Sequence, residues 1–317
     1  MNDNFSLIKS YDIPNDYELN LKKFDGFLFQ SPLWLNQIKN SNEQIVYYSL
    51  NDKDKVVGIC AGLEIHSRYR ILKNIKKELS FTSYPAIKNN DVFLLNSFLK
   101  LLAKEISIPI LSHLKINGHF NVYDPLEISI PRVKSFRRYE FILDITKSEE
   151  ELWKNFNKGI KYNIKQTIKS SAVIEILGID TGIKIFQNLH MEMNEFRTKS
   201  NRPLIAYSNI FSKLNYINDE NIHIVSLKLN NEYVSAAIFT TYHNKAHYTF
   251  SVSNEIGYQY GSSSMIIWEA IKLFKSKYIE YLNLGGYAGY LSSANDGLKI
   301  FKSGFGSHVV YSPILKL

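Results

Sequence analysis

Alternating apolar and polar residues, interspersed with stretches whose apolar residues recur every three or four positions, predict a mixed α/β protein. In the first half, this pattern predicts two helices and three strands. The helices are expected near Ser31–Lys39 and over Asp91–Glu105, and the strands at Ile45–Leu50, Val56–Glu64 and Leu111–Ile116. A basic, irregular stretch, residues 131–138, then leads to a further strand at Tyr139–Asp144.

The second half begins with a capping box at Ser148, which predicts the start of a helix. Apolar residues at helical spacing give this helix a core face, and lysines lie on the flank beside it. The apolar residues are Trp153, Phe156, Ile160, Ile164 and Ile168, and the lysines are Lys158, Lys161, Lys165 and Lys169. One helix is therefore expected to carry a basic stripe beside a buried face.

An antiparallel meander of three strands is expected next, because short polar turns separate three apolar runs. Before it come a strand at Val173–Leu177 and helices near Thr181–Glu195 and Tyr207–Leu214. The meander strands are Ile222–Leu229, Tyr233–Tyr242 and Ala246–Val252, followed by a helix at Met265–Lys275 and a strand at Tyr278–Leu284. This order resembles the core of a GNAT acetyltransferase fold.

The composition is that of a globular protein, with 45% hydrophobic and 21% charged residues, and 317 residues favour two domains. The single cysteine, Cys60, excludes an intrachain disulfide. The first residues lack the features of a signal peptide, so we expect a cytoplasmic protein. A net charge of +8 favours anionic partners, among them a nucleotide, a phosphorylated sugar, tRNA or an acidic membrane face.

The segment Leu282–Gly306 contains the strongest candidates for a functional site. A strand runs into Gly285 and Gly286, which allow close approach of a ligand to the backbone, and Lys302 follows at the end of a short helix. The alternative is a plain turn followed by a solvated lysine. Gly261 and the serines after it could bind phosphate at a helix start, or could simply cap that helix.

Other candidates are weaker by pattern alone. The lysine stripe could bind an anionic substrate or could be a solvated face. Arg197 and Arg202 could bind phosphate or could lie at the surface. His243 and His247 span a predicted turn, which is a poor arrangement for one metal ion, and we expect no metal.

Several segments resemble the FemABX superfamily of peptidyl and acyl transferases, which are built from two GNAT-like domains. These are Phe29–Trp34, Arg138–Ser170, Ser262–Lys275 and Leu282–Gly306. The resemblance implies two tandem GNAT-like domains, each with a mixed, mainly antiparallel sheet flanked by helices. We expect them at residues 1–137 and 138–306, with a strand in 307–317 that could return to the first domain.

The resemblance also implies the site residues. Phe301 and Lys302 match the catalytic Phe-Lys of the family, where the ammonium would stabilise an oxyanion, and Lys158 and Lys161 would face the phosphates of a nucleotide- or lipid-linked sugar. The expected substrate- or phosphate-binding residues are Lys158, Lys161, Asn163, Lys165, Arg197, Arg202, Tyr248, Gly261, Ser262, Ser263, Gly285 and Gly286.

Two departures from the family pattern leave the reaction open. Asn117 stands where bridge-forming members tend to have an aspartate, and the second domain lacks the long helical hairpin of some tRNA-using members. We expect an N-acyltransferase that forms an amide on an amino sugar or peptide of a cell-envelope or surface-polysaccharide precursor, from an activated acyl donor such as acyl-CoA. One alternative is an aminoacyl-tRNA-dependent peptidyl transferase acting on a peptidoglycan precursor. The other is a catalytically decayed module that binds an anionic glycan or nucleic acid. Contact with the inner membrane face and the oligomeric state stay open.

Overall fold

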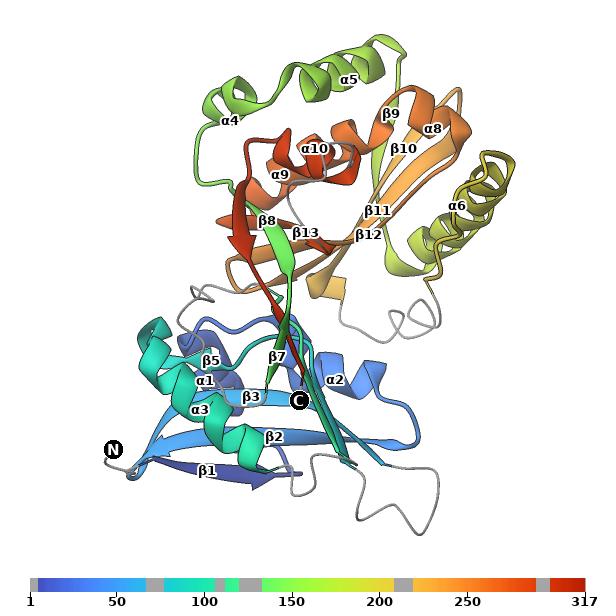
Figure 1. The fold of residues 1–317 in the computed structure, drawn as a ribbon. Helices are drawn as coiled ribbons and strands as arrows, with labels where there is room; N and C mark the ends of the chain where they lie inside the picture. Colours follow the sequence, from blue (N-terminus) through green and yellow to red (C-terminus); the bar gives the residue numbers. More distant parts are fainter. Residues whose placement is uncertain are drawn as a thin grey trace. The chain divides into compact units, whose positions relative to one another are not determined.

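The computed structural model describes residues 5–66, 77–105, 112–119, 133–207, 219–288 and 297–316. The chain forms two compact units, each built on one β-sheet (Figure 1). The first unit contains residues 1–140, 286–290 and 310–317, and the second contains residues 141–285 and 291–309.

Within the described residues, the first sheet has eight strands in the order β1-β2-β3-β4-β6-β15-β7, with β5 beside β3. The strands β4 and β6 are parallel, and β15, near the end of the chain, lies antiparallel between β6 and β7. The bounds are β1 (Phe5–Ser10), β2 (Glu43–Asp52), β3 (Lys55–His66), β4 (Lys77–Phe81), β5 (Ala86–Ile87), β6 (His113–Ile116), β7 (Lys134–Phe136) and β15 (Ile314–Lys316).

Helices cover this sheet and close its core. The helix α3 begins at Asp91, whose carboxylate accepts hydrogen bonds from the N–H groups of Phe93 and Leu94, and its apolar face packs with fully buried sheet residues such as Tyr48 and Phe81. The bounds are α1 (Tyr17–Lys23), η1 (Leu28–Gln30), α2 (Pro32–Ile38), η3 (Lys88–Asn90) and α3 (Val92–Lys104).

The second sheet has the order β14-β8-β13-β12-β11-β10-β9 in the part of the chain that the structure describes. The predicted antiparallel meander is present as β10, β11 and β12, and β13 pairs with β12 in parallel. The bounds are β8 (Arg138–Asp144), β9 (Val173–Leu177), β10 (Ile222–Leu229), β11 (Glu232–Tyr242), β12 (Lys245–Ser253), β13 (Tyr281–Ala288) and β14 (His308–Tyr311).

Two helices cover opposite faces of the meander. Gly182 of α6 packs against Ile224, whereas Phe274 of α9 packs against His223 and Phe239 on the other face. The helix α5 lies outside α9, where the Thr167 hydroxyl donates to the carbonyl oxygen of Tyr260 over 3.0 Å. The bounds are α4 (Glu149–Asn155), α5 (Lys158–Lys169), α6 (Ile179–Lys199), η5 (Asp219–Asn221), α8 (Glu255–Gln259), α9 (Ser262–Ser276) and α10 (Gly297–Ser303).

The prediction of one continuous helix after Ser148 is wrong. The capping box at Ser148 is present, but the helix ends at Phe156, and Asn157 caps a second helix by accepting the N–H of Ile160. The second helix therefore turns a different face toward the core than one continuous helix would. Ile168, expected on the core face, is 59% exposed. The helix predicted at Tyr207–Leu214 lies mostly outside the described residues, and Tyr207 itself is not helical.

We predict that His223 makes the stability of the second unit depend on pH. Burial, assisted by the charge of Lys277, lowers the pKa of His223 to about 4. The unfolded chain, with a histidine pKa near 6.5, binds this proton more readily, so stability is lost as the pH falls from about 6.5 to about 4, by up to about 3 kcal/mol.

The variant His223→Gln should remove that part of the pH dependence while keeping a polar group beside the Thr241 hydroxyl. Urea unfolding at pH 7.5, 5.5 and 4.5 measures it, with His243→Gln, at an exposed turn position, as control. An unchanged slope in His223→Gln would show that another group controls the acid response.

Candidate functional site

The strands β12 and β13 separate inside the second unit. Their registered pairs run from Lys245↔Tyr281 to His247↔Asn283, although β12 continues to Ser253 and β13 to Ala288. A register shift between β11 and β12 at Ile238/Phe239 lies beside this point. We call the place where the described pairing ends the strand fork. Backbone groups beyond such a fork can pair with an extended ligand.

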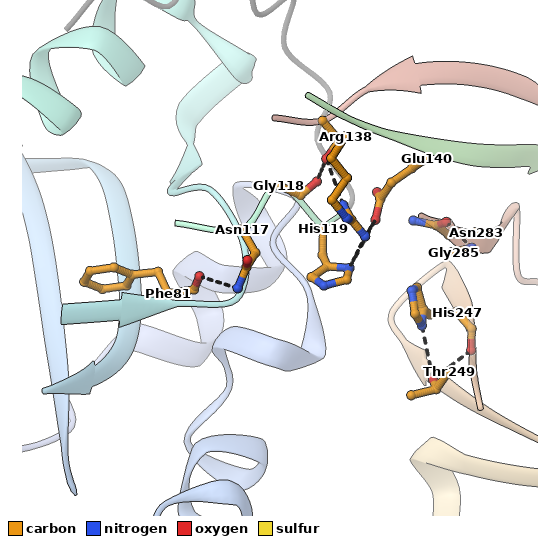
Figure 2. Close-up of polar contacts among 11 residues, drawn as sticks. Phe81, Asn117, Gly118, His119, Arg138, Glu140, His247, Thr249, Asn283 and Gly285 are labelled. Carbon is orange, nitrogen blue, oxygen red and sulfur yellow. Dashed lines mark hydrogen bonds and ion pairs between the residues drawn. The ribbon is translucent and has the colours of Figure 1, made fainter. Parts of the chain in front are cut away.

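Gly285 shapes the fork. Its φ of 84° is in the left-handed region, and its N–H donates to the Asn283 side-chain oxygen over 2.7 Å (Figure 2). A Cβ at Gly285 would lie 3.2 Å from the Lys302 Nζ and 3.6 Å from the Tyr248 carbonyl oxygen. The Lys302 ammonium therefore lies against bare backbone, in space that only glycine leaves open.

The segment that carries Lys302 is fixed by aromatic packing. Lys302 is only 6% exposed, at the end of α10. Phe305 packs edge-on against Phe301 and Phe156, with ring centroids 5.4 Å and 5.2 Å apart. The Asn157 N–H donates to the Gly304 carbonyl oxygen over 2.8 Å, which ties α10 to the start of α5. The position of the cation is thus set by the core.

Polar side chains of β12 line the same strand end. His247, which is 5% exposed, places its Nδ1 3.1 Å from the Thr249 hydroxyl (Figure 2). Burial raises the pKa of Tyr248, so the phenol stays protonated at neutral pH. The Ser263 hydroxyl lies 3.3 Å from that of Ser253, which continues to Ser235 over 2.7 Å. Beyond the fork, β12 therefore carries neutral hydroxyl groups.

The start of α9, a predicted phosphate site, is covered by α5. Gly261 is its N-cap residue with φ 63°, and a Cβ there would meet Asn163 at 2.4 Å. The Asn163 side chain donates to the Ser264 hydroxyl over 3.3 Å, and Ser262 and Ser264 are fully buried. Phosphate binding at Gly261, Ser262 and Ser263 stays a prediction, and a phosphate there would have to displace Asn163.

The predicted cationic residues are distributed over the second unit. Lys158 and Lys165 are exposed on α5, whereas the half-buried Lys161 donates to the Lys154 carbonyl oxygen over 3.0 Å. Arg197 donates to the Pro203 carbonyl oxygen over 2.6 Å, and the Arg202 guanidinium lies 6.0 Å from the Phe196 ring. Both arginines thus stabilise the loop that follows α6.

A charged cluster in the first unit was missed by sequence reasoning. Arg138 donates to the fully buried Glu140 carboxylate over 2.8 Å, and His119 Nδ1 lies 3.1 Å from the same oxygen (Figure 2). Arg138 also donates to the Ser312 hydroxyl over 3.3 Å. A Cβ at Gly286 would overlap the Arg138 guanidinium, which explains the second glycine of the pair. The available signal was two charged residues at i and i+2 in an apolar strand.

His119 is held as a neutral ring in this cluster. Burial lowers the pKa of His119, the Arg138 charge lowers it further, and the hydrogen bond to Glu140 opposes both. His119 Nδ1 lies 3.1 Å from the Glu140 carboxylate oxygen and 3.1 Å from an Arg138 guanidinium nitrogen, so this ring nitrogen faces both an acceptor and a donor. His119 also lines a small pocket with Gln30, Ser83 and Tyr84.

Asn117 has a structural use in the first unit. Its backbone N–H donates to the Phe81 carbonyl oxygen over 2.8 Å, and its side-chain amide donates to the same oxygen over 3.4 Å (Figure 2). An ionised aspartate could not make the second bond. The amide therefore secures the end of β4 beside β6.

A two-sheet chain whose second unit has an antiparallel meander, a forked parallel pair and an intervening helix has the fold of tandem GNAT proteins. The chain aligns with a tandem GNAT protein from the clavulanic acid biosynthesis pathway with a TM-score of 0.54 and 8% identity, covering 99% of this chain and 98% of that chain. The predicted fold class is thereby confirmed.

The family resemblance is confirmed as well, since residues 214–313 match the model of the FemAB family. FemX aligns with a TM-score of 0.72 and 14% identity, covering 98% of this chain and 96% of that chain. L-PGS from Bacillus licheniformis aligns with a TM-score of 0.55 and 10% identity, covering 96% of this chain and 91% of that chain. No curated protein sequence matches the chain. Among the described residues, none of the helices combines the length and apolar character needed to cross a membrane.

We predict that Gly285→Ala lowers the free energy of unfolding by about 1–3 kcal/mol, because alanine strains a φ of 84° and crowds the Lys302 ammonium. The matched control is Gly297→Ala at the start of α10, where a Cβ would meet nothing within 4 Å, and its effect should stay within about 1 kcal/mol. Denaturant unfolding of both variants measures this. Equal effects would refute the constraint at Gly285.

Proposed function

We propose that this chain is an aminoacyl transferase that moves an aminoacyl group from charged tRNA to an amino group of a cell-envelope precursor. The single observation that carries this proposal is the position of Lys302, a buried cation seated against Gly285 at the strand fork. A fixed positive charge in a site with little water stabilises an oxyanion far better than a solvated lysine does.

The reaction forms one bond and breaks one. The nitrogen of the acceptor amine attacks the carbonyl carbon of the aminoacyl ester, and a C–N bond forms while negative charge develops on the carbonyl oxygen. Lys302 stabilises this oxygen. The C–O bond to the tRNA ribose then breaks, and the proton lost by the amine goes to the departing ribose oxygen. Lys302 supplies charge and is not consumed.

The backbone N–H of Gly285 is not available to the reacting oxygen in this scheme. It donates to Asn283 over 2.7 Å, so it holds the turn. We therefore assign Asn283 and Gly285 to positioning of the Lys302 segment, with Lys302 as the group that meets the reacting oxygen. Tyr248, whose phenol stays protonated, is the residue of β12 that we assign to relay the proton to the leaving oxygen.

The covered start of α9 favours an ester donor over acyl-CoA. A coenzyme A thioester brings a pyrophosphate, which a helix start would ordinarily bind, but Asn163 fills the space over Gly261 and Ser262 is fully buried. An aminoacyl ester requires no phosphate at that place. The likeness to FemX supports the choice of an aminoacyl ester as donor. The acceptor we propose is an amine of a nucleotide- or lipid-linked sugar or of its peptide.

A donor test separates the candidate functions. Purified protein is incubated with tRNA carrying a radiolabelled amino acid, or with labelled acetyl-CoA, together with peptide-bearing and amino-sugar nucleotides, and the products are identified by mass spectrometry. We expect labelled amide from charged tRNA alone. Product from acetyl-CoA would replace this proposal with an N-acetyltransferase, and binding without product from either donor would indicate a decayed binding module.

We predict that Lys302→Met lowers kcat by about 10²–10³-fold, the typical cost of losing one oxyanion-stabilising group. Methionine has a similar length, so the melting temperature should change little. Lys184→Met on the exposed side of α6 is the matched control for loss of one positive charge. Full activity of folded Lys302→Met in the transfer assay would remove Lys302 from the chemistry.

A further inference from the structure

The outer face of α5 carries one continuous exposed row of side chains. Lys158, Tyr162, Lys165 and Lys169 lie at positions i, i+4, i+7 and i+11, which fall on one face of a helix. All four are exposed, and Tyr162 is 62% exposed. We call this row the α5 stripe. It extends over about 16 Å at 1.5 Å per residue.

Most of the opposite face of α5 is buried in the fold, although Ile168 near its end is 59% exposed. Ile160 and Ile164 are buried, and the Thr167 hydroxyl donates to the Tyr260 carbonyl oxygen over 3.0 Å. An amphipathic helix that lies in a membrane needs its apolar face free to enter the lipid. Because Ile160 and Ile164 are buried and only Ile168 is exposed, the outer surface of α5 offers chiefly cations and an aromatic ring.

The charges of the stripe have no local counterparts. The segment Lys158–Lys169 contains no acidic residue. Among the described residues, Lys158, Lys165 and Lys169 form no ion pair. Three cations on a rigid helix therefore present a fixed field to an anionic partner.

Tyr162 distinguishes this surface from a plain basic patch. The Gln166 side chain donates to the Tyr162 hydroxyl over 2.7 Å, which restrains a ring that stays largely exposed between lysines. Cations that follow a phosphate backbone, combined with an aromatic ring on which a base can stack, are the features of a surface for single-stranded nucleic acid.

The α5 stripe begins next to the residue that anchors the segment carrying Lys302. Lys158 directly follows Asn157, whose N–H donates to the Gly304 carbonyl oxygen two residues beyond Lys302. We propose that the α5 stripe binds the single-stranded 3′ end of tRNA, with phosphates on Lys158, Lys165 and Lys169 and a base stacked on Tyr162. This inference rests on the proposed function, and it assigns Lys158 and Lys165 to RNA instead of acceptor phosphates.

The first test is direct binding of uncharged tRNA, measured by fluorescence anisotropy over a range of salt concentrations. The triple variant Lys158→Gln, Lys165→Gln, Lys169→Gln should bind about 10–100-fold more weakly at 0.15 M salt, and the slope of log K against log salt should fall by about 2. The matched control, Lys184→Gln, Lys199→Gln, Lys277→Gln, removes the same charge from exposed positions elsewhere in the second unit. Equal losses of tRNA affinity in the two triple variants would overturn the assignment of tRNA binding to the α5 stripe.

The second test isolates the stacking. Tyr162→Ala should weaken tRNA binding about tenfold without changing the salt slope, whereas Tyr162→Phe should bind almost as tightly as the wild type. Removing the unpaired 3′ nucleotides from the tRNA should abolish the difference between Tyr162→Ala and the wild type. If Tyr162→Ala binds intact tRNA normally, the stacking assignment is wrong.

The outcomes also separate this inference from the proposed function. If the lysine triple variant still transfers from charged tRNA with unchanged KM, the RNA-binding role of the α5 stripe is wrong, whereas the proposed function is unaffected. If tRNA binds through the α5 stripe but the wild type transfers nothing, the proposed function is wrong and the RNA-binding role of the stripe holds. Loss of binding to phosphatidylglycerol vesicles with unchanged tRNA binding would assign the stripe to a membrane and overturn its RNA role.

Discussion

The contact between the Lys302 ammonium and the bare backbone of Gly285 is the constraint on which the second unit depends. A side chain at position 285 would occupy the space beside that amine, and the φ of 84° would be strained for any other residue. Asn283 holds the Gly285 amide from within the same strand. The end of β13 thus leaves room for the Lys302 ammonium, and this cation is the group to which we assign the chemistry of the strand fork.

The packing around α10 explains how a lysine can be held there. Burying a charge is costly unless its surroundings are fixed and polar groups face it, and the aromatic rings of Phe156, Phe301 and Phe305 set the position of the helix end. The Asn157–Gly304 hydrogen bond then links the same segment to α5. As a result, one short region of the chain connects the proposed transfer centre to the exposed row of lysines.

The elements that the sequence predicted are those whose signal is local. The helix α3 and the meander strands show their own periodicity and turns, so their type and order were predictable. The break at Asn157 was missed because the apolar spacing continues through it, although the Asn157 side chain caps the second helix locally and its N–H is bonded to the Gly304 carbonyl oxygen far along the chain. Lys302 was predicted as a site residue from its resemblance to a family motif, which local pattern could not supply, and its role stays a prediction. The buried pair of Arg138 and Glu140 was missed because its partner His119 meets it only in the folded unit.

The central claim is that a positive charge at position 302 drives the transfer, and chemical replacement of that charge tests it most directly. In a background where the buried Cys60 is replaced by alanine, Lys302→Cys is alkylated with bromoethylamine under denaturing conditions and refolded, which restores an ammonium at nearly the original length. Transfer from charged tRNA should be absent before alkylation and should return to a large fraction of the wild-type rate afterwards. Wild-type transfer by the unalkylated variant would contradict the account.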